Sequence, residues 1–253
     1  MVADMIKTLI YTNLGNYRQN NEDAVLLNDE IVFEKSMEEP KFYELNDGYV
    51  LAAVSDGMGG YAKGEVAAKI TLESLKELKP KNEKEIRRAI IAARDKLDEY
   101  VKKNSSGFGM GCALAGLVAE NGKAVAFNTG DCRVYRFIGN RIAKITIDHS
   151  IVQELILNGI ITEEEEKTHP ERNILTSAVA GDNGLTPLEI YTVLLDILTK
   201  DKFLICSDGL WEELSKNEIE EFLKTGDKAE FIKTIIKNKP LMDNISFIIL
   251  EFN

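Results

Sequence analysis

Residues 49–60 read YVLAAVSDGMGG, an apolar run that ends at Asp56 and is followed by three glycines within four residues. Residues 202–209, KFLICSDG, repeat this arrangement and end with Asp208 and a glycine. Short runs of β-branched, aromatic and other apolar residues are typical of buried strands. Each stretch therefore predicts a strand that carries a carboxylate to the end of a sheet.

The glycines after Asp56 have two interpretations. Asp-Gly is a common turn dipeptide, because Gly adopts backbone conformations that other residues avoid. Alternatively, another group approaches the backbone here: Gly57 would let its carbonyl face a metal ion, while Gly59 and Gly60 would leave room for waters and substrate. The second interpretation depends on whether other charged residues reach the same place.

Four further carboxylates stand at predicted strand ends or turns. Asp243 precedes the last apolar run, Glu22 and Asp23 precede an early one, and Asp131 lies in a Thr-Gly-Asp turn. Each alone is an ordinary turn or capping residue. As a group, carboxylates raise one another's pKa unless a cation neutralises them. Oxygen ligands favour Mg²⁺ or Mn²⁺ over zinc, and the chain has only two histidines.

The hydrophobic periodicity predicts an α+β protein. Apolar residues at helical spacing predict two long helices, over 64–78 and 83–101, and two capping boxes predict short helices between about 148 and 170. Residues 188–198 are compatible with either a helix or a strand. Helices that occur in adjacent pairs favour largely antiparallel sheets covered by helices over a parallel sheet. The predicted strands are 25–27, 49–54, 123–128, 133–138, 203–206 and 245–252.

Composition restricts the class of protein. The chain has 253 residues and a formal net charge of −11, which argues against a nucleic-acid surface. No apolar run approaches the roughly 20 residues that span a bilayer, and the N-terminus lacks the pattern of a signal peptide. We therefore expect a cytoplasmic protein with no membrane or nucleic-acid partner, folded as one domain over 1–253. The three cysteines show no CxxC spacing and are expected to be buried free thiols.

The chain resembles the metal-dependent Ser/Thr protein phosphatases of type 2C, in particular their bacterial branch. The resemblance covers nearly the whole chain and consists of eight blocks in the same order. These blocks are GNYRQNNEDA, VSDGMGG, GMGCALAGL, NTGDCRVY, IDHSIVQELILNGIIT, HPERNILT, ICSDGLWEEL and DNIS.

The resemblance implies a four-layer α-β-β-α sandwich, with two mostly antiparallel sheets flanked by helix pairs and a flap insert near 146–182. It also implies two Mn²⁺ or Mg²⁺ ions per site, with a third and weaker ion. Matching the motifs residue by residue implies that Arg18 binds the substrate phosphate, and that the metals are bridged or held by Asp56, Gly57, Asp208, Asp243, Asp23, Glu22 and Asp131.

The implied activity is hydrolysis of phosphoserine and phosphothreonine on proteins, which reverses the action of a Ser/Thr kinase. A hydroxide bridging the metals would attack phosphorus in line, with no covalent enzyme intermediate. A planar guanidinium such as that of Arg18 can clamp two phosphate oxygens, which a lysine cannot. The implied partners are phosphoprotein substrates, and a monomer is the default state.

Three positions depart from parts of this family. Animal members have a histidine, a proposed general acid, where this chain has Met58, so the leaving alkoxide would be protonated by another group. Bacterial relatives usually have a histidine where Tyr61 stands and an arginine near Ser177. These departures bear on substrate contacts more than on metal binding.

Three rival functions are weighed against the phosphatase. A pseudophosphatase that signals through a partner would lack metal ligands, whereas every expected carboxylate is present. A nucleotide-binding protein would need a phosphate loop, but neither 57–64 nor the GFGMG of 107–111 matches a Walker or dinucleotide motif. A two-metal nuclease is disfavoured by the acidic composition.

Overall fold

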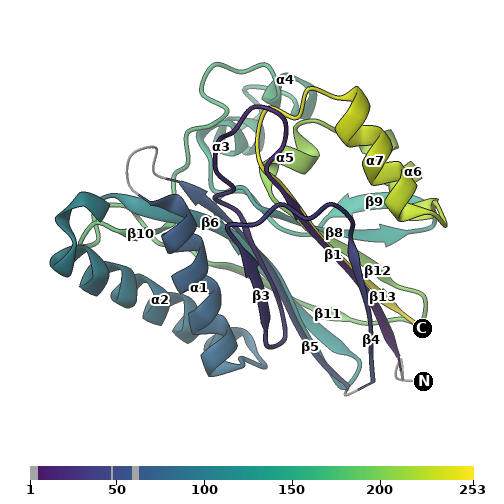
Figure 1. The fold of residues 1–253 in the computed structure, drawn as a ribbon, viewed down its shortest axis with the longest axis horizontal. Coiled ribbons are helices and arrows are strands. Elements are labelled where there is room, and N and C mark those ends of the chain that lie inside the picture. The colour runs from purple at the N-terminus through teal and green to yellow at the C-terminus, as the bar shows by residue number, and fades with distance from the viewer. Residues whose placement is uncertain (1–4, 47, 59–62) are drawn as a thin grey trace.

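The computed structural model describes residues 5–46, 48–58 and 63–253. Two antiparallel sheets lie face to face at its centre (Figure 1). The first sheet contains, in spatial order, β4 (Lys41–Leu45), β1 (Ile6–Asn13), β13 (Ile245–Phe252), β12 (Lys202–Cys206), β8 (Arg133–Ile138) and β9 (Arg141–Lys144). The second contains β11 (Tyr191–Asp196), β7 (Lys123–Thr129), β6 (Met110–Glu120), β5 (Tyr49–Met58), β2 (Ala24–Leu27) and β3 (Glu30–Phe33), with β10 (Val179–Gly181) paired to the start of β6.

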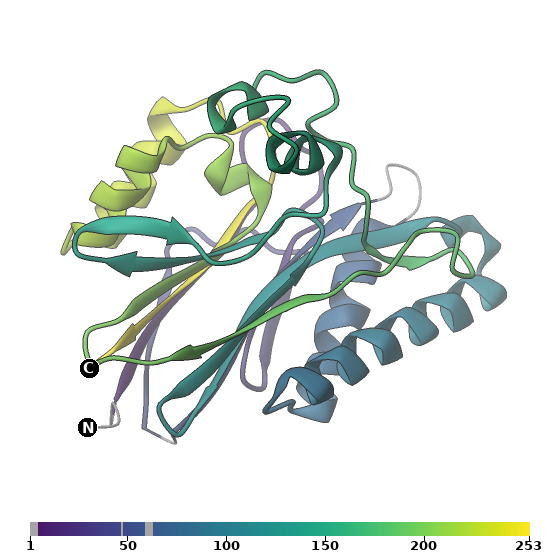
Figure 2. The same ribbon diagram turned by 180° about the vertical axis from the view of Figure 1, so that it is seen from behind.

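Helices cover the outer sides of both sheets, which confirms the four-layer α-β-β-α arrangement (Figures 1 and 2). The pair α1 (Gly64–Leu78) and α2 (Glu83–Lys103) covers the second sheet, and α6 (Lys216–Lys224) and α7 (Lys228–Asn238) lie beside the first. The remaining helices are short: η1 (Ser105–Gly107), α3 (Ile151–Leu157), α4 (Glu163–Glu166) and α5 (Asp208–Trp211). No helix in the described ranges is long and apolar enough to cross a bilayer.

Side chains alternate along β5, so the second sheet packs against the first sheet with one face and against α1 and α2 with the other. Val50, Ala52 and Val54 face the first sheet and belong to the core between the sheets. Leu51 and Ala53 point the other way and belong to the core under α1 and α2. Because successive residues of a strand point to opposite faces, a strand buried on both sides must be apolar throughout. This accounts for the continuous apolar run of residues 50–54.

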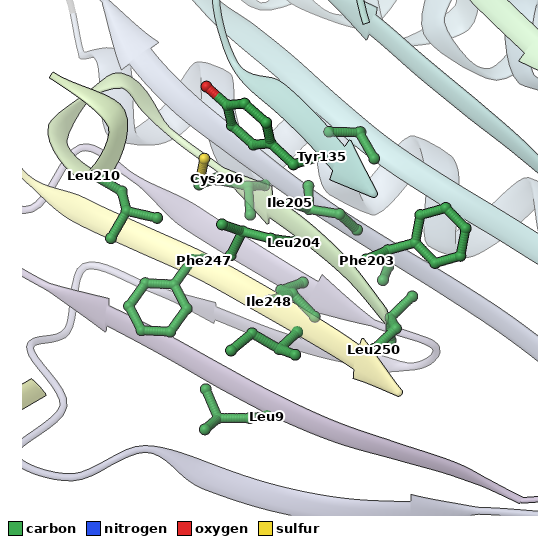
Figure 3. Close-up of a cluster of buried hydrophobic side chains, with 14 of the residues drawn as sticks. Leu9, Tyr135, Phe203, Leu204, Ile205, Cys206, Leu210, Phe247, Ile248 and Leu250 are labelled. Atoms are coloured by element: carbon green, nitrogen blue, oxygen red, sulfur yellow. The ribbon is translucent and has the colours of Figure 1, made fainter. Parts of the chain in front are cut away.

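The first sheet is held by large apolar side chains of its central strands. Figure 3 shows Phe203, Leu204, Ile248 and Leu250 of β12 and β13 gathered with their neighbours. Phe247 contacts Tyr11 of β1 and Phe222 of α6, with ring centroids 5.5 and 5.3 Å apart. Aromatic contacts of this kind attach α6 to the sheet beyond the area that they bury.

The segment 146–182 contains the two short helices that its capping residues predict. The Ser150 side chain accepts a hydrogen bond from the backbone N–H of Gln153 at the start of α3. Thr162 and Glu165 form a capping box at the start of α4. The segment 188–198, ambiguous in sequence, contains the edge strand β11. In Figure 1, α3, α4 and α5 lie together at the end of the sandwich that is remote from both termini.

Candidate metal centre

Asp56 and Gly57 lie within β5 and not in a turn. The strand pairs with β6 through Asp56–Ala113 and Gly57–Cys112, so the turn interpretation of this Asp-Gly is wrong. The glycine is required because the chain approaches it closely: a Cβ on Gly57 would lie 2.4 Å from the carbonyl of Gly64. The Gly57 N–H also donates to the carbonyl of Glu22, 3.2 Å away. The group that closely approaches Gly57 in the structure is the protein's own backbone, and the role of the Gly57 carbonyl as a metal ligand stays a prediction.

Asp208 and Asp243 are brought together by a second close approach of two backbones. Asp208 begins α5 directly after β12, and Asp243 lies two residues before β13. A Cβ on Gly209 would lie 2.0 Å from the carbonyl oxygen of Asn244 and 3.6 Å from the Cβ of Asp243. Only glycine allows these segments to meet at this separation. The Ser-Asp-Gly of residues 207–209 therefore ends with glycine for the same physical reason as the Asp-Gly of β5.

Asp23 is buried and is held by neighbouring hydroxyl groups. Ser207 donates from its Oγ to Asp23 Oδ2 over 2.8 Å, and Ser207 Oγ in turn accepts from the backbone N–H of Ser246, 3.1 Å away. The other oxygen of Asp23, Oδ1, is buried without a hydrogen-bond partner in the described part of the chain, as is Oδ1 of Asp208. Buried carboxylate oxygens without partners are costly in a folded protein.

Asn244 organises the site, and the sequence argument did not single it out. Its Oδ1 accepts from the backbone N–H of Glu22, 2.8 Å away. Its Nδ2 donates to the carbonyls of Leu14 and Asn20, each over 3.0 Å. These bonds fix the β1–β2 connection, which carries Arg18, Glu22 and Asp23, against the start of β13. The only sequence signal was its place in the DNIS block.

Four carboxylates, those of Asp23, Asp56, Asp131 and Asp208, form what we call the acidic cluster. Burial raises the pKa of each, and the charges of neighbouring carboxylates raise it further. The effect brings the pKa of Asp23 to about 7, although hydrogen bonds from Ser246 and Ser207 oppose it. The pKa of Asp56 is raised by burial and then by the charges of four carboxylates, which are those of Asp23, Asp208, Asp131 and Asp243. The structure therefore brings these sequence-predicted residues into one electrostatic neighbourhood.

Glu22, Asp243 and Arg18 stand at the exposed edge of the acidic cluster. The Arg18 guanidinium donates to Asp243 Oδ2, and this bond is the main cause of the raised pKa of Arg18. Burial raises the pKa of Glu22, with a further contribution from Glu65, while Arg18 lowers it. Arg18, the predicted phosphate-binding residue, is therefore hydrogen-bonded in this structure to Asp243, a predicted metal ligand.

The donor set of the acidic cluster fits divalent metal ions. It consists of oxygen atoms, two of them buried without partners, and every member has its pKa raised as expected where negative charges lack a cation. Among the described residues, no three His, Cys, Asp or Glu side chains are grouped tightly enough to hold a metal ion as they stand. Hard cations prefer such oxygen donors, so the fit lies in the chemistry of the donors and not in a shell that is already assembled.

Asp131 is connected to the flap through Trp211 and Arg133. Its carbonyl accepts a hydrogen bond from Trp211 Nε1 over 3.1 Å. The Arg133 guanidinium lies over the Trp211 ring, 3.4 Å from its centroid. Arg133 is paired with Asp148 and Glu166, which both belong to the segment 146–182. No local pattern in the sequence indicates this contact.

The positions that depart from the family lie in different surroundings. Ser177 is buried, and its Oγ accepts from the N–H of Glu189 over 2.7 Å and lies 3.0 Å from Thr129 Oγ1. Met58 ends β5 and is partly buried. Gly59, Gly60 and Tyr61 lie outside the described residues. The three cysteines are buried and free, as expected.

Comparisons with known proteins agree with this geometry. The family model described as protein phosphatase 2C matches residues 40–237. The serine/threonine phosphatase Stp of Listeria welshimeri is 29% identical over 255 aligned positions, which cover 96% of this chain and 94% of that protein.

Solved structures resemble the fold over its whole length. The serine/threonine phosphatase Stp1 of Staphylococcus aureus has a TM-score of 0.79 and 29% identity, covering 100% of this chain and 96% of that one. The catalytic domain of the phosphatase PstP, solved with two manganese ions, has a TM-score of 0.76 and 24% identity, covering 98% of each chain. The latter likeness shows the shared fold.

Proposed function

Because the chain belongs to the protein phosphatase 2C family, we propose that the acidic cluster is its metal centre and that Arg18 binds the substrate phosphate. The chain is a metal-dependent serine/threonine phosphatase of the bacterial branch, with a two-metal site for Mn²⁺ or Mg²⁺, and its substrates are phosphoproteins. The observation that supports the assignment is the group of carboxylates formed by buried Asp23 and partly buried Asp56, Asp131 and Asp208, whose pKa values are all raised.

In this proposal, Asp56, Asp208 and Asp243 hold the metal ions together with the carbonyl of Gly57. Asp23 and Glu22 would hold metals or their waters, and Asp131 and Asp208 would hold a third ion. When bound, the metals supply Lewis acidity and lower the pKa of water towards neutrality. The protein's part is to keep these oxygens fixed, through the hydrogen bonds that Asn244 and Ser207 make.

Arg18 is placed to receive the phosphate group. Its guanidinium is half exposed at the edge of the cluster and is engaged by a single carboxylate, that of Asp243. A phosphate group offers two oxygens in the geometry that a guanidinium fork matches. We expect the phosphate to draw Arg18 from Asp243, which leaves Asp243 free for a cation.

The test is phosphate release from a phosphothreonine peptide with Mn²⁺ titrated in. The wild type is compared with Asp208→Asn and with a control, Asp29→Asn, which removes an exposed carboxylate. Metal-dependent release that Asp208→Asn lowers by about 10²- to 10³-fold, and that the control retains, would support the proposal. No release by folded wild type at any Mn²⁺ or Mg²⁺ concentration would refute it.

We further propose that the chain acts as one domain over 1–253, as a cytoplasmic monomer, on proteins phosphorylated by a Ser/Thr kinase. The net charge of −11 supports the absence of a nucleic-acid partner. Sedimentation or light scattering of the metal-loaded protein would test the oligomeric state. A dimer at micromolar concentration would contradict the monomer.

A further inference from the structure

A polar groove of about 350 Å³ opens beside the candidate metal centre. Gln19, Asn20 and Asn21 form one side of it, and they are the residues between Arg18 and Glu22 in the chain. The opposite sides come from the turn after β3 and from Glu65 at the start of α1. The groove is therefore lined by the residue that follows, in the chain, the arginine that we assign to the phosphate.

Glu65 is held close to the metal centre by the contact between the two glycine segments. A Cβ on Gly64 would lie 2.9 Å from Glu22 Oε2 and 2.7 Å from the backbone of Gly57. The side chain of Glu22 thus lies against the residue that precedes Glu65. Glu65, which lines the groove, therefore follows directly after a residue that Glu22 contacts.

The groove is built before any ligand arrives, because its sides are bonded to each other. Asn21 Nδ2 donates to the carbonyl of Lys35 over 2.7 Å and to Thr12 Oγ1 over 2.8 Å. The backbone N–H of Leu14 donates to Ser36 Oγ over 2.8 Å. A preformed site spares a ligand the cost of ordering the protein.

The lining of the groove suits an extended polypeptide with a basic side chain. Gln19, Asn20 and Ser36 offer uncharged donors and acceptors, which match the alternating N–H and C=O groups of an extended backbone. Glu34 and Glu65 bring two negative charges against the single positive charge of Lys35. Neither glutamate forms an ion pair with another residue in the described ranges.

We propose that this groove binds the substrate polypeptide next to its phosphorylated residue, and that Glu34 and Glu65 select substrates with lysine or arginine there. The inference rests on the proposed function, because it places the phosphate at Arg18. It adds a specificity-determining surface, on the β1–β2 and β3 side of the site, that lies outside the metal ligands.

The test compares phosphothreonine peptides whose flanking residues are lysine, alanine or glutamate, with p-nitrophenyl phosphate as a substrate that has no polypeptide. For each variant the measured quantity is the ratio of kcat/KM for the lysine and glutamate peptides. This internal ratio cancels differences in folding and in the catalytic step. We expect a ratio of about tenfold for the wild type, decreasing as salt rises.

Two double variants carry the comparison. Glu34→Gln with Glu65→Gln should lower the ratio towards one, and Glu34→Lys with Glu65→Lys should invert it in favour of the glutamate peptide. The control, Glu44→Gln with Glu221→Gln, makes the same change of net charge as the double glutamine variant, at exposed positions of β4 and α6. It should keep the wild-type ratio.

The outcomes separate the two proposals. A wild-type ratio near one, or a ratio that the groove and control variants change equally, overturns the groove and leaves the phosphatase assignment standing. If the wild type hydrolyses neither the peptides nor p-nitrophenyl phosphate at any Mn²⁺ concentration, the assignment of the metal centre fails and the groove fails with it.

Discussion

The acidic cluster and the neighbouring Arg133 cluster both place carboxylates in buried or partly buried positions, but they differ in what balances the charge. In the Arg133 cluster, which we define as Arg133, Asp148, Glu166 and Lys144, two cations face two carboxylates. The side chains of Arg133 and Asp148 are 6% and 1% exposed. The acidic cluster has four carboxylates, and the arginine at its edge, Arg18, is 53% exposed.

The difference separates a structural site from a site that needs a ligand. Buried charges persist when they are paired and hydrogen-bonded, and Arg133 meets this condition within the protein. Under the proposed function, the acidic cluster would meet it through bound metal ions. The two clusters also share Trp211, which stacks on Arg133 and donates to the carbonyl of Asp131. Through Trp211, the Arg133 cluster thus helps to hold the backbone of Asp131 in the acidic cluster.

Removing the cation of the Arg133 cluster should have the largest effect on stability. Arg133→Met leaves Asp148 and Glu166 buried, with only Lys144 to pair Asp148 at 3.3 Å. We expect a loss of about 3–5 kcal/mol in the free energy of unfolding, measured by urea titration of the fluorescence of Trp211, the single tryptophan. Arg133→Lys keeps the charge and should lose less. A loss below about 1 kcal/mol for Arg133→Met would contradict the structural role.

Binding of a cation to the acidic cluster should have the second largest effect on the free energy of unfolding of the protein. Mn²⁺ at 100 times its dissociation constant should raise the free energy of unfolding by about 2.7 kcal/mol, because it binds only the folded state. Thermal unfolding with and without chelator measures the difference. Asp56→Asn should remove this Mn²⁺ effect while Asp29→Asn retains it. An equal effect of Mn²⁺ on both variants would place the metal elsewhere.

The stability of the metal-free protein should depend on pH because of the carboxylates of the acidic cluster. The pKa of Asp23 is about 7 in the folded state, because of burial and then of nearby Asp208 and Asp243, against an ordinary value of 3.8. The folded state therefore holds a proton that the unfolded chain releases. This contribution is fully present below about pH 4 and is lost as pH rises to 7, with a slope of at most about 1.4 kcal/mol per pH unit.

Urea titrations in chelator from pH 4.5 to 7.5 test this prediction. Asp23→Asn should have a flatter dependence than the wild type, because its amide does not titrate. The comparison isolates Asp23 from other groups, such as Glu218, whose pKa is lowered to about 2 by its bond to Lys239. Parallel curves for the two proteins would exclude Asp23 as the titrating group.

Local patterns allowed much of the fold to be predicted. The helix α1 and the strands β5, β12 and β13 have strong periodicity or continuous apolar runs, so sequence and structure agree on them. The strand β6 was missed. Its residues, MGCALAGLVAE, are small because it is buried between the other sheet and α1. Small residues have low strand propensity, and tertiary packing overrides that preference.

The carboxylates of the candidate site could be picked out from the sequence because most of them stand beside strands or turns, but the hydrogen bonds that hold their segments together could not. Asn244 bonds to Leu14 and Asn20 across 230 and 224 positions. The stacking of Arg133 on Trp211 likewise joins segments that only the fold brings together. Periodicity and turn chemistry describe neighbours in sequence, so they carry no information about such pairs.

The smallest expected effect comes from an ion pair on the surface. Asp29 lies 2.9 Å from the ammonium group of Lys79, with side-chain exposures of 64% and 56%. Asp29→Asn should change the free energy of unfolding by less than about 0.5 kcal/mol, because water and salt already screen the pair. Asp148→Asn, in the Arg133 cluster, should cost more, because the buried Arg133 then loses a charged partner. If urea titration gave equal losses for both substitutions, burial would not be what distinguishes the balanced cluster, and the contrast with the acidic cluster would lose its basis.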